Sequence, residues 1–508
     1  MSSSAISGNK TIAKNTIFLY VRMILLMGVS LYTVRVVLNI LGEIDYGIYS
    51  AIGGIVITFS FLTQTLVSAS QRFFAVELGR GDKTELKKTY NAILFSYIII
   101  AVVVVLLLET VGLWFVQNKM TIPPDRMGAA LWLFQFSIFT FISQILVNPY
   151  MSIIIAQEDM KTYAYVSILE AVLKLGVAFS LMFISYDKLE LYGILLFVVG
   201  VMIFLIYYII CKKRYDYVSF NKKIDKKKLK EVFTFSSWTL FGTMAGTANG
   251  QCINVMLNVF YGPVVNTAYA IGHQVSVVLG QVANNFFSAV RPPMTKSYAI
   301  GDMSKTVELF YFSSKILIVL MLVIIVPLYF EIEYLLTLWL GDVEPYMVSF
   351  SRLLLINIAI LCIGNPITAI VQAAGAVKKY HVLVDGFALL SLPIMYIAFK
   401  MNCKPEMAFV ISNTVFVIAH IIRLMILKSV MPFSYGEYVK RLILPTGLII
   451  AVSSFVAYVV GVGVSSDIVR LITVVISSVI AIMVLSLYLM LSRYERGHLI
   501  GLIKSKIK

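Results

Sequence analysis

Charged residues are scarce in this chain of 508 residues: they make up 13% of it, whereas hydrophobic residues make up 59%. So little charge excludes an ordinary soluble domain. Cysteine is also scarce, and the four cysteines include no CxxC pair, so we expect neither a disulfide framework nor a metal site. The chain has no P-loop, HExxH, GxSxG or DxD sequence, and no loop long enough to form a catalytic domain. An enzyme is therefore not expected.

Long apolar runs recur along the whole chain, and the mean hydropathy is +0.89. Each run could cross ~30 Å of hydrocarbon as a helix. We predict an all-α polytopic membrane protein with about fourteen transmembrane helices. The predicted spans are roughly 16–41, 46–78, 89–116, 128–156, 162–185, 190–211, 231–260, 264–299, 306–330, 346–376, 381–400, 406–430, 441–462 and 468–491. The first run lacks the cleavage site of a signal peptide, so we expect it to be retained.

Positive charge is distributed unevenly around these spans. With the N-terminus inside, 28 of the 42 Lys and Arg residues lie on or beside cytoplasmic segments, six in outer loops and eight within apolar segments. The positive-inside rule therefore predicts that both termini are cytoplasmic. Topology also accounts for the net charge of +16, so we expect the basic stretch 212–230 to rest on anionic lipid and not on nucleic acid.

The chain contains an internal repeat with an offset near 219 residues. At this offset eight identical residues align within 37 positions, among them Arg72 with Arg291. At an offset of 220, the Gly-Asp pair at 81–82 aligns with that at 301–302. A unit of six helices crosses the membrane an even number of times, so the two copies share one orientation. The substrate site of such a transporter is expected at the interface between the repeats.

This repeat predicts the domain organisation. We expect an N-terminal six-helix lobe over residues 1–211 and a basic cytoplasmic linker over 212–230. A second six-helix lobe would follow over 231–430, and two additional helices with a basic C-terminal tail over 431–508. The predicted architecture is thus two parallel-repeat lobes plus two extra helices.

Several cations lie inside the apolar segments. They are Arg22, Arg35, Arg72, Lys174, Arg291, Lys315, Arg352 and Arg423. An ionised side chain in hydrocarbon costs at least ~2.5–3.5 kcal/mol on insertion scales, so each is a functional-site hypothesis by default. They outnumber the buried acids, of which Glu109, Glu170 and Asp385 are the clearest. A cationic membrane interior indicates that the protein handles an anion.

The strength of the hypothesis differs among these cations. Arg72 and Arg291 are repeat-related and each ends a polar helical stripe, although snorkelling to the interface is an alternative for both. Arg22 lies about 140° around the same helix from Arg35, so a straight helix would not aim both at one ligand. Lys174 is one turn from Glu170 and an ion pair between them is the alternative. The planar guanidinium group of arginine suits phosphate, because it can donate two parallel hydrogen bonds to it. Lys315, Arg352 and Arg423 lie near span ends and are interpreted as anchors.

Two spans carry bulky polar side chains on one helical face. The face of span 231–260 includes Thr247, Gln251, Asn254 and Asn258, and that of span 264–299 includes Gln281, Asn284 and Asn285. In lipid such faces must point into protein or into a water-filled cavity. We predict that they line a cavity between the lobes. A helix-packing seam is the alternative that stays open.

Three stretches make the sequence similar to a known family. The run LGEIDYGIY at 41–49, QRFF at 71–74 and an Asn-Pro…Ala…Lys run at the end of the tenth span resemble polysaccharide-unit flippases. These are Wzx-like O-antigen or capsule repeat flippases, in the superfamily that includes the multidrug and toxic-compound extrusion (MATE) transporters. The resemblance covers nearly the whole chain. Fourteen spans depart from the twelve common among such flippases, which leaves the related lipid II flippases as an open branch.

The resemblance implies a function. The protein would move an undecaprenyl-diphosphate-linked oligosaccharide from the inner to the outer leaflet of the bacterial cytoplasmic (inner) membrane, for lipopolysaccharide O-antigen, capsule or another surface polysaccharide. Alternating access would drive the movement. Arg35, Arg72 and Arg291, supported by Arg22 and Lys174, would hold the diphosphate, while the polar faces meet sugars.

The resemblance also implies partners. They would be the lipid-linked oligosaccharide, membrane lipids and, by contact, the glycan polymerase and glycosyltransferases, with the flippase itself a monomer. No cofactor or metal is implied. Coupling to H⁺ or Na⁺ stays open, with Glu109 and Asp385 as the candidate acids.

Two other functions compete with this interpretation. A cation-coupled multidrug exporter of the same fold should present carboxylates to cationic drugs, but the first span offers Arg22 and Arg35 and no acid. A membrane-embedded glycan polymerase usually needs a sizeable outer loop with acid–base residues, which the predicted topology does not provide. Both rivals are therefore ranked below a flippase.

Overall fold

Helices occupy nearly all of the chain that the computed structural model describes, namely residues 2–157, 159–220 and 225–490. No strand occurs in these ranges, which confirms the predicted all-α class. The internal contacts divide the chain into two units, Met1–Ala270 and Ile271–Lys508. This division differs from the lobes drawn from the sequence repeat, whose boundaries stay a prediction.

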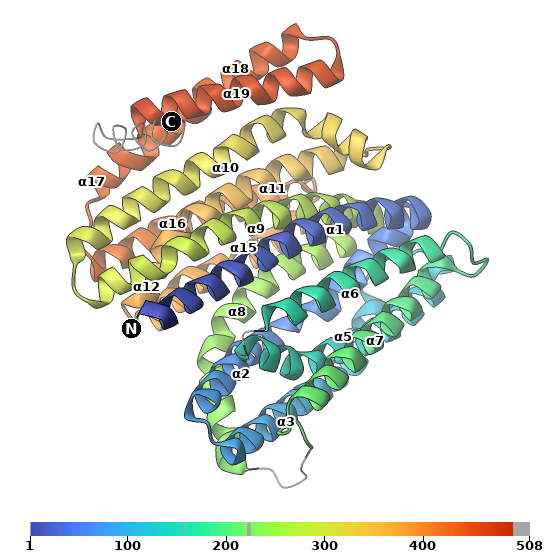
Figure 1. Ribbon diagram of the computed structural model, residues 1–508. Helices are drawn as coiled ribbons and strands as arrows, with labels where there is room; N and C mark the ends of the chain where they lie inside the picture. The colour runs from blue at the N-terminus through green and yellow to red at the C-terminus, as the bar shows by residue number, and fades with distance from the viewer. Residues whose placement is uncertain (1, 158, 221–224, 491–508) are drawn as a thin grey trace. The chain divides into compact units, whose positions relative to one another are not determined.

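The first unit begins with a long, bent helix. Helix α1 (Ser2–Thr58) bends at Gly42, and α2 (Ser60–Arg80) and α3 (Lys83–Leu107) follow. A π-helical turn (Leu108–Gly112) joins α3 to α4 (Leu113–Asn118). The remaining helices are α5 (Met127–Ala156), α6 (Met160–Ser180), α7 (Lys188–Arg214), α8 (Lys226–Tyr261) and the start of α9 (Pro263–Ala299). Helix α5 packs along α7, and α6 packs along both α7 and α1 (Figure 1).

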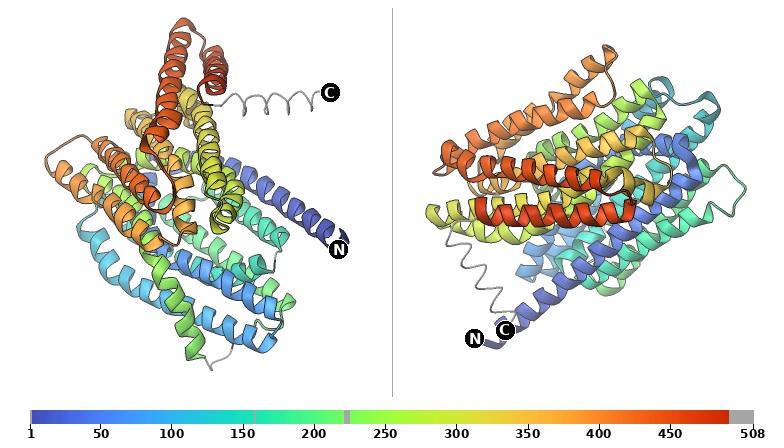
Figure 2. Two further views of the ribbon diagram at one scale, coloured as in Figure 1. Left: turned by 90° about the vertical axis from the view of Figure 1, so that its left-hand side faces the viewer. Right: turned by 90° about the horizontal axis from the view of Figure 1, so that it is seen from above.

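The second unit is built around the long helix α10 (Met303–Leu340). It also contains α11 (Pro345–Ile363), α12 (Asn365–Ala373), α13 (Val377–Tyr380), a π-helical turn (His381–Asp385), α14 (Gly386–Ala388), α15 (Ser391–Lys400) and α16 (Met407–Val430). The chain ends with α17 (Tyr435–Tyr438), a third π-helical turn (Val439–Ile443), α18 (Leu444–Gly463) and α19 (Asp467–Leu489). Helices α18 and α19 form a hairpin that packs against α10 (Figure 2).

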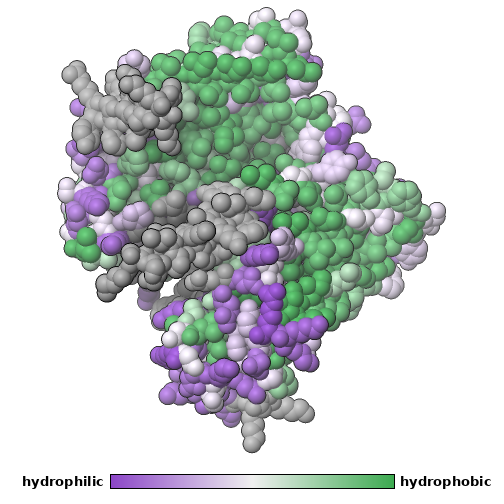
Figure 3. Space-filling view, viewed as in Figure 1, coloured by the Kyte–Doolittle hydropathy of each residue, from purple (hydrophilic) through white to green (hydrophobic). Residues whose placement is uncertain are grey.

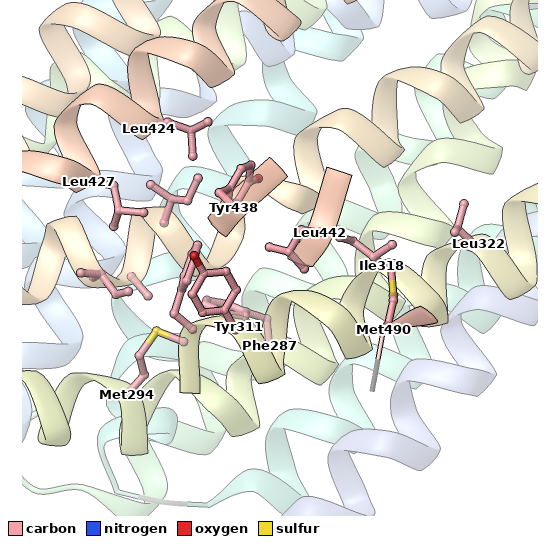
Figure 4. Packing of buried hydrophobic residues seen from close by; sticks show 14 of the residues in the cluster. Phe287, Met294, Tyr311, Ile318, Leu322, Leu424, Leu427, Tyr438, Leu442 and Met490 are labelled. Carbon is pink, nitrogen blue, oxygen red and sulfur yellow. The ribbon is translucent and has the colours of Figure 1, made fainter. Parts of the chain in front are cut away.

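An apolar core joins this hairpin to the rest of its unit. Phe287 of α9, Tyr311 and Ile318 of α10, and Leu424 of α16 belong to one buried cluster with Tyr438 of α17 (Figure 4). The cluster continues into α18 and α19. Burying each large side chain stabilises the unit by roughly 1.5–3 kcal/mol. The two extra helices are therefore an integral part of the second unit.

The sequence repeat reappears in the backbone as pairs of left-handed glycines. Gly81 and Gly301, from the repeated Gly-Asp pair, have φ angles of 73° and 79°. The aspartate after each glycine caps the next helix by accepting backbone N–H hydrogen bonds. Gly42 and Gly262 have φ angles of 75° and 84° and the same separation in sequence as Gly81 and Gly301. Glycine is required there because L side chains rarely adopt positive φ.

Apolar side chains cover large parts of the surface. Along α18 and α19, Phe455, Tyr458, Val462, Ile468 and Tyr488 are each more than 60% exposed. Figure 3 shows the region of these two helices as mostly apolar surface. A face of this kind on a monomeric soluble protein would promote aggregation, whereas in lipid it is the expected exterior.

Eleven helices in the described ranges are long and apolar enough to cross a membrane. Three predicted spans have no counterpart of their own among the eleven: 46–78, at the end of α1 and α2, 231–260, in α8, and 264–299, in α9. These are the spans that carry the polar stripes, which lower their hydropathy. The predicted count of fourteen is therefore not confirmed, but a multi-pass membrane protein is.

Candidate functional site

The amides predicted to line a cavity on α8 lie partly at a contact with α1. The Nδ2 group of Asn254 donates to the Ser50 carbonyl at 3.0 Å, and Asn254 is only 4% exposed. Asn266 in turn donates to the backbone and side-chain oxygens of Asn254, at 2.7 and 2.6 Å. A Cβ on Gly54 would lie 2.7 Å from the Asn254 Nδ2 and 3.0 Å from the Gln251 Oε1. Gly54 therefore lets the amides of α8 approach α1 closely.

The junction of α8 and α9 makes further close contacts in the same unit. The Oδ1 atom of the fully buried Asn258 accepts a hydrogen bond from the Thr121 backbone N–H at 3.0 Å. The Thr267 hydroxyl donates to the Glu43 carbonyl at 2.6 Å. A Cβ on Gly47 would lie 1.9 Å from the Pro263 carbonyl oxygen. We call this set of contacts, together with the Asn254–Ser50 hydrogen bond, the amide clasp.

The other predicted cavity residues are more accessible. Thr247 and Gln251 are half-buried on α8. On α9, Gln281 and Asn284 are exposed and Asn285 is half-buried. In this conformation the structure therefore separates two groups within the predicted polar faces. Asn254 and Asn258 hold helices together, and the other five amide or hydroxyl side chains keep more of their surface accessible.

Two intramembrane arginines on α1 differ in their surroundings. The Nη2 group of Arg22 donates to the Tyr163 hydroxyl of α6 at 3.1 Å, and its guanidinium carbon lies 4.4 Å from the centre of that ring. Arg35 is half-buried, and the described part of the structure provides it with no hydrogen bond or ion pair. Arg22 is thus occupied by a contact between α1 and α6, whereas the described residues provide no such partner for Arg35.

The remaining candidate cations have different surroundings again. Lys174 forms an ion pair with Glu170 at 2.6 Å, as its spacing allowed. Arg72 is exposed on α2. Arg291 is also exposed, and its Nη2 group donates to the neutral Oε1 of Gln372 at 2.5 Å. Neither Arg35 nor Arg291 has a carboxylate partner among the described residues.

The interpretation as interfacial anchors does not fit two of the three cations, because Lys315 is buried, at 8% exposed, and so is Arg423. Arg423 was expected to be an anchor near the end of a span, but it is only 7% exposed. Its Nη1 atom occupies the space next to Gly364, where a Cβ would lie 2.4 Å away. The guanidinium therefore packs against the break between α11 and α12 instead of reaching the interface.

Both candidate coupling acids lie in π-helical turns. Glu109 belongs to the turn after α3, and its Oε2 accepts a hydrogen bond from the Gln135 amide at 3.1 Å. Asp385 belongs to the turn after α13, and its Oδ2 lies 2.6 Å from the Nδ1 atom of His381. Such turns leave backbone carbonyls without their usual partners and occur frequently at functional sites.

The structure also contains an ion-pair cluster that the sequence analysis did not identify. Arg126 binds Asp45 of α1 through Nε and Nη2, at 2.8 and 2.6 Å, and Asp187 before α7 at 2.6 Å. Asp187 has a pKa below its ordinary value: burial alone would raise it, but hydrogen bonds from Arg126 and from the backbone of α7 lower it more. Asp45 lies within the LGEIDYGIY stretch, so this cluster provides a structural reason for an acid there.

Comparison with known families decides the assignment. Residues 12–298 match the family described as "Polysaccharide biosynthesis protein". The chain belongs to this family. No curated protein sequence matches it.

Solved structures resemble this polysaccharide biosynthesis protein over most of its length. A lipid II flippase MurJ in an inward closed conformation has a TM-score of 0.71 at 14% identity, covering 93% of this chain and 98% of that one. An inward-facing multidrug resistance MATE transporter of the MOP superfamily has a TM-score of 0.60 at 14% identity, covering 79% and 95%. A MOP superfamily transporter from Pyrococcus furiosus has a TM-score of 0.57 at 14% identity, covering 82% and 96%.

Identities this low establish the fold alone. The chain therefore has the all-helical fold that the MurJ and MATE transporters share. With eleven helices in its described ranges that are apolar and long enough to cross a membrane, it is a multi-pass membrane protein.

Proposed function

We propose that this protein moves an undecaprenyl-diphosphate-linked oligosaccharide from the inner to the outer leaflet of the bacterial cytoplasmic membrane. The product would feed a surface polysaccharide. The family supports the pathway, because it is one of polysaccharide biosynthesis. The fold supports the mechanism, because MurJ and MATE transporters share it. The identity of the substrate is inferred from the positive charge within the apolar segments.

The observation that carries the proposal is Arg35. It lies within a helix that is apolar enough to span the membrane, and no acid or hydrogen-bond acceptor in the described structure compensates it. An ionised arginine in hydrocarbon is expensive unless something neutralises it. A diphosphate group would do so, since its oxygens match the planar guanidinium fork. A cationic drug would not.

Arg291 is the second residue we assign to the diphosphate. Its hydrogen-bond partner among the described residues, Gln372, is neutral and leaves the positive charge available to attract an anion. Arg72 is its counterpart in the sequence repeat and is the third candidate. Arg22 and Lys174 already have partners in this structure, so we expect them to contribute less. The accessible amides Gln251, Gln281, Asn284 and Asn285, with Thr247, would meet the sugars.

The membrane potential supplies a driving force. A negative-inside potential favours outward movement of anions by ~2.3 kcal/mol per charge per 100 mV. A diphosphate with about two charges would gain roughly 4–5 kcal/mol per 100 mV. Return of the empty cationic cavity costs energy again, so we keep Glu109 and Asp385 as candidate H⁺ or Na⁺ coupling residues. Amide replacement of both should then remove any dependence of transport on an ion gradient.

Lipid II is the second candidate substrate. The observation that favours it is the match to the lipid II flippase MurJ, which covers 93% of this chain and 98% of that one. Both candidates are flippase substrates. They differ in the saccharide that the protein must accommodate.

Native mass spectrometry of the purified protein separates these functions. The protein would be challenged in turn with a polyprenyl-diphosphate oligosaccharide, with lipid II and with a cationic dye. We expect retention of the oligosaccharide lipid, weakened by Arg35→Ala and Arg291→Ala. Arg22→Ala is the matched control, because Arg22 lies on the same helix as Arg35 but is held by Tyr163.

Each outcome distinguishes one hypothesis. Preferential retention of lipid II would move the protein to the second candidate. Retention of the dye alone would refute a cationic substrate site and indicate a drug exporter. Equal retention of the oligosaccharide lipid by the Arg35→Ala variant and the wild type would remove Arg35 from the site.

A further inference from the structure

The basic end of α8 is attached to α2 and α3 by an ion-pair cluster. The Nζ atom of Lys228 lies 2.7 Å from the Glu77 Oε1 and 3.4 Å from the Glu85 Oε2. Asp225 caps α8 by accepting hydrogen bonds from the backbone of Lys227 and Lys228. The cap orients the first turn of α8, so that Lys228 points its ammonium group at both carboxylates.

Lys228 is the principal partner of a buried acid. Glu77 is 2% exposed, and its Oε2 atom has no hydrogen-bond partner in the described structure. Arg80 also approaches Glu77, but at 3.5 Å and with a side chain that is 66% exposed. Removing Lys228 would therefore leave a buried carboxylate poorly compensated, which is strongly unfavourable.

The charges around Lys228 favour its ionised form. Burial lowers the pKa of Lys228, but its hydrogen bonds and ion pairs with Glu77 and Glu85 raise it more, so the pKa lies above the ordinary value. Glu85 is shared with Lys88, whose Nζ atom lies at 2.7 Å. Lys228 thus bridges a buried acid on α2 and a second acid on α3.

The opposite end of α8 is attached to α1 by a different kind of contact. There the amide clasp uses hydrogen bonds between neutral groups and the close approach of Gly54 to Asn254. Helix α8 has 36 residues and is therefore about 54 Å long at 1.5 Å per residue. Uncharged hydrogen bonds thus hold one end of the helix and ion pairs the other.

We propose that Lys228, Glu77 and Glu85 form an ionic latch that keeps the predicted cytoplasmic end of α8 closed against α2 and α3. With the latch released, this end of α8 swings away while the amide clasp holds the far end. The swing exposes Val232, which is buried when the latch is closed. The role of this opening in admitting substrate rests on the flippase function proposed above, whereas the existence of the latch does not.

Cysteine alkylation measures the opening of the latch directly. Val232 lies one turn after Lys228 on α8 and is 1% exposed. The variant Val232→Cys therefore reports opening, provided that the four native cysteines are replaced by alanine. The protein is placed in lipid nanodiscs and the rate of reaction with a charged maleimide is followed. Lys227→Met is the matched control, because Lys227 is the exposed neighbour and forms no ion pair in the described structure.

We expect the reporter to react about tenfold faster, or more, after Lys228→Met or Glu77→Gln, because each removes a charge-assisted hydrogen bond. Glu85→Gln should give a smaller increase, since its distance to Lys228 is longer. Lys227→Met should stay within about twofold of the parent protein. Equal rates for all four variants would overturn the latch.

A second reporter distinguishes opening from unfolding. Leu133 of α5 is fully buried against Gly193 of α7, so Leu133→Cys should stay slow in every variant. Parallel acceleration at both reporters would show that Lys228 stabilises the whole unit, which also overturns the proposal. The assay contains no substrate, so its result is independent of whether the substrate assignment is correct.

A reducible cross-link tests the part of the inference that concerns transport. Glu77→Cys combined with Lys228→Cys, bridged by a short bis-thiosulfonate reagent that spans the space left by the two long side chains, should hold the latch closed and stop delivery of polysaccharide to the surface, reversibly on reduction. Unchanged delivery by the fully cross-linked protein would show that the latch has no role in transport. The alkylation result would still hold in that case.

Discussion

Replacing Gly47 by alanine should separate α1 from the junction of α8 and α9. The added Cβ would lie 1.9 Å from the Pro263 carbonyl oxygen, 2.6 Å from its carbon and 3.0 Å from the Cα. These are backbone atoms, so a rotamer change cannot relieve the clash. Ordinary contact begins at 3.4 Å, so the two backbones must separate by about 1.5 Å, the difference between 3.4 and 1.9 Å.

Such a separation would break neighbouring contacts of the amide clasp. The Thr267–Glu43 hydrogen bond, at 2.6 Å, would lengthen beyond the range of a hydrogen bond, and so would the Asn254–Ser50 hydrogen bond at 3.0 Å. Each lost hydrogen bond costs about 1 kcal/mol, and overpacking adds typically 1–3 kcal/mol. The Gly47→Ala variant should therefore be destabilised by roughly 3–5 kcal/mol.

Thermal unfolding of the purified protein in detergent measures this effect, with Gly53→Ala as the matched control. A Cβ on Gly53, on the same helix, meets nothing within 4 Å. Alanine is favoured over glycine inside a helix by up to ~1 kcal/mol, so this control should be as stable as the wild type or more stable. Equal melting temperatures for the two variants would refute the close contact between Gly47 and Pro263.

Three further predictions concern side-chain contacts. Arg126→Ala should lower thermal stability by more than the loss of a surface ion pair would, because it leaves Asp45 and Asp187 facing each other without a cation. The pKa of Asp187 is lower in the folded state, so its contribution to stability is present above its ordinary pKa of 3.8 and is lost as the pH falls below that value. A thermal-unfolding series from pH 6 to 3 measures this loss, and Arg126→Ala should make the melting temperature depend less on pH. Asn254→Leu should destabilise by about 1–3 kcal/mol in chemical denaturation, since Asn266 loses one of its two acceptors and the Ser50 carbonyl loses its donor.

The sequence was sufficient for the fold class and for local features. Apolar runs and charge asymmetry predicted a polytopic helical protein, because both follow directly from the cost of polar groups in lipid. The spacing of Glu170 and Lys174 allowed their ion pair, since residues four apart share a helical face. The repeated Gly-Asp pair likewise indicated two equivalent turns, and the backbone contains both.

Contacts between distant segments could not be predicted in the same way. Periodicity showed that Asn254 and Asn258 share a polar face with Gln251, but not that Asn254 would bind α1 and Asn258 the backbone of Thr121, leaving Gln251 more accessible. Arg126 lies 81 residues from Asp45 in sequence, and neither periodicity nor charge asymmetry indicates that two residues so far apart meet. The π-helical turn at Glu109 has no sequence signature, because it depends on how the neighbouring helices pack.

The paired left-handed glycines have a consequence for the ancestry of the fold. The two halves of the chain have diverged until few side chains match, yet Gly42 and Gly262, like Gly81 and Gly301, retain the same backbone conformation. A gene duplication can thus be preserved in dihedral angles after it has faded from residue identities, since a Cβ at these positions is selected against in both halves. Remote relatives should therefore be recognisable by the spacing of such glycines when overall similarity no longer reveals them.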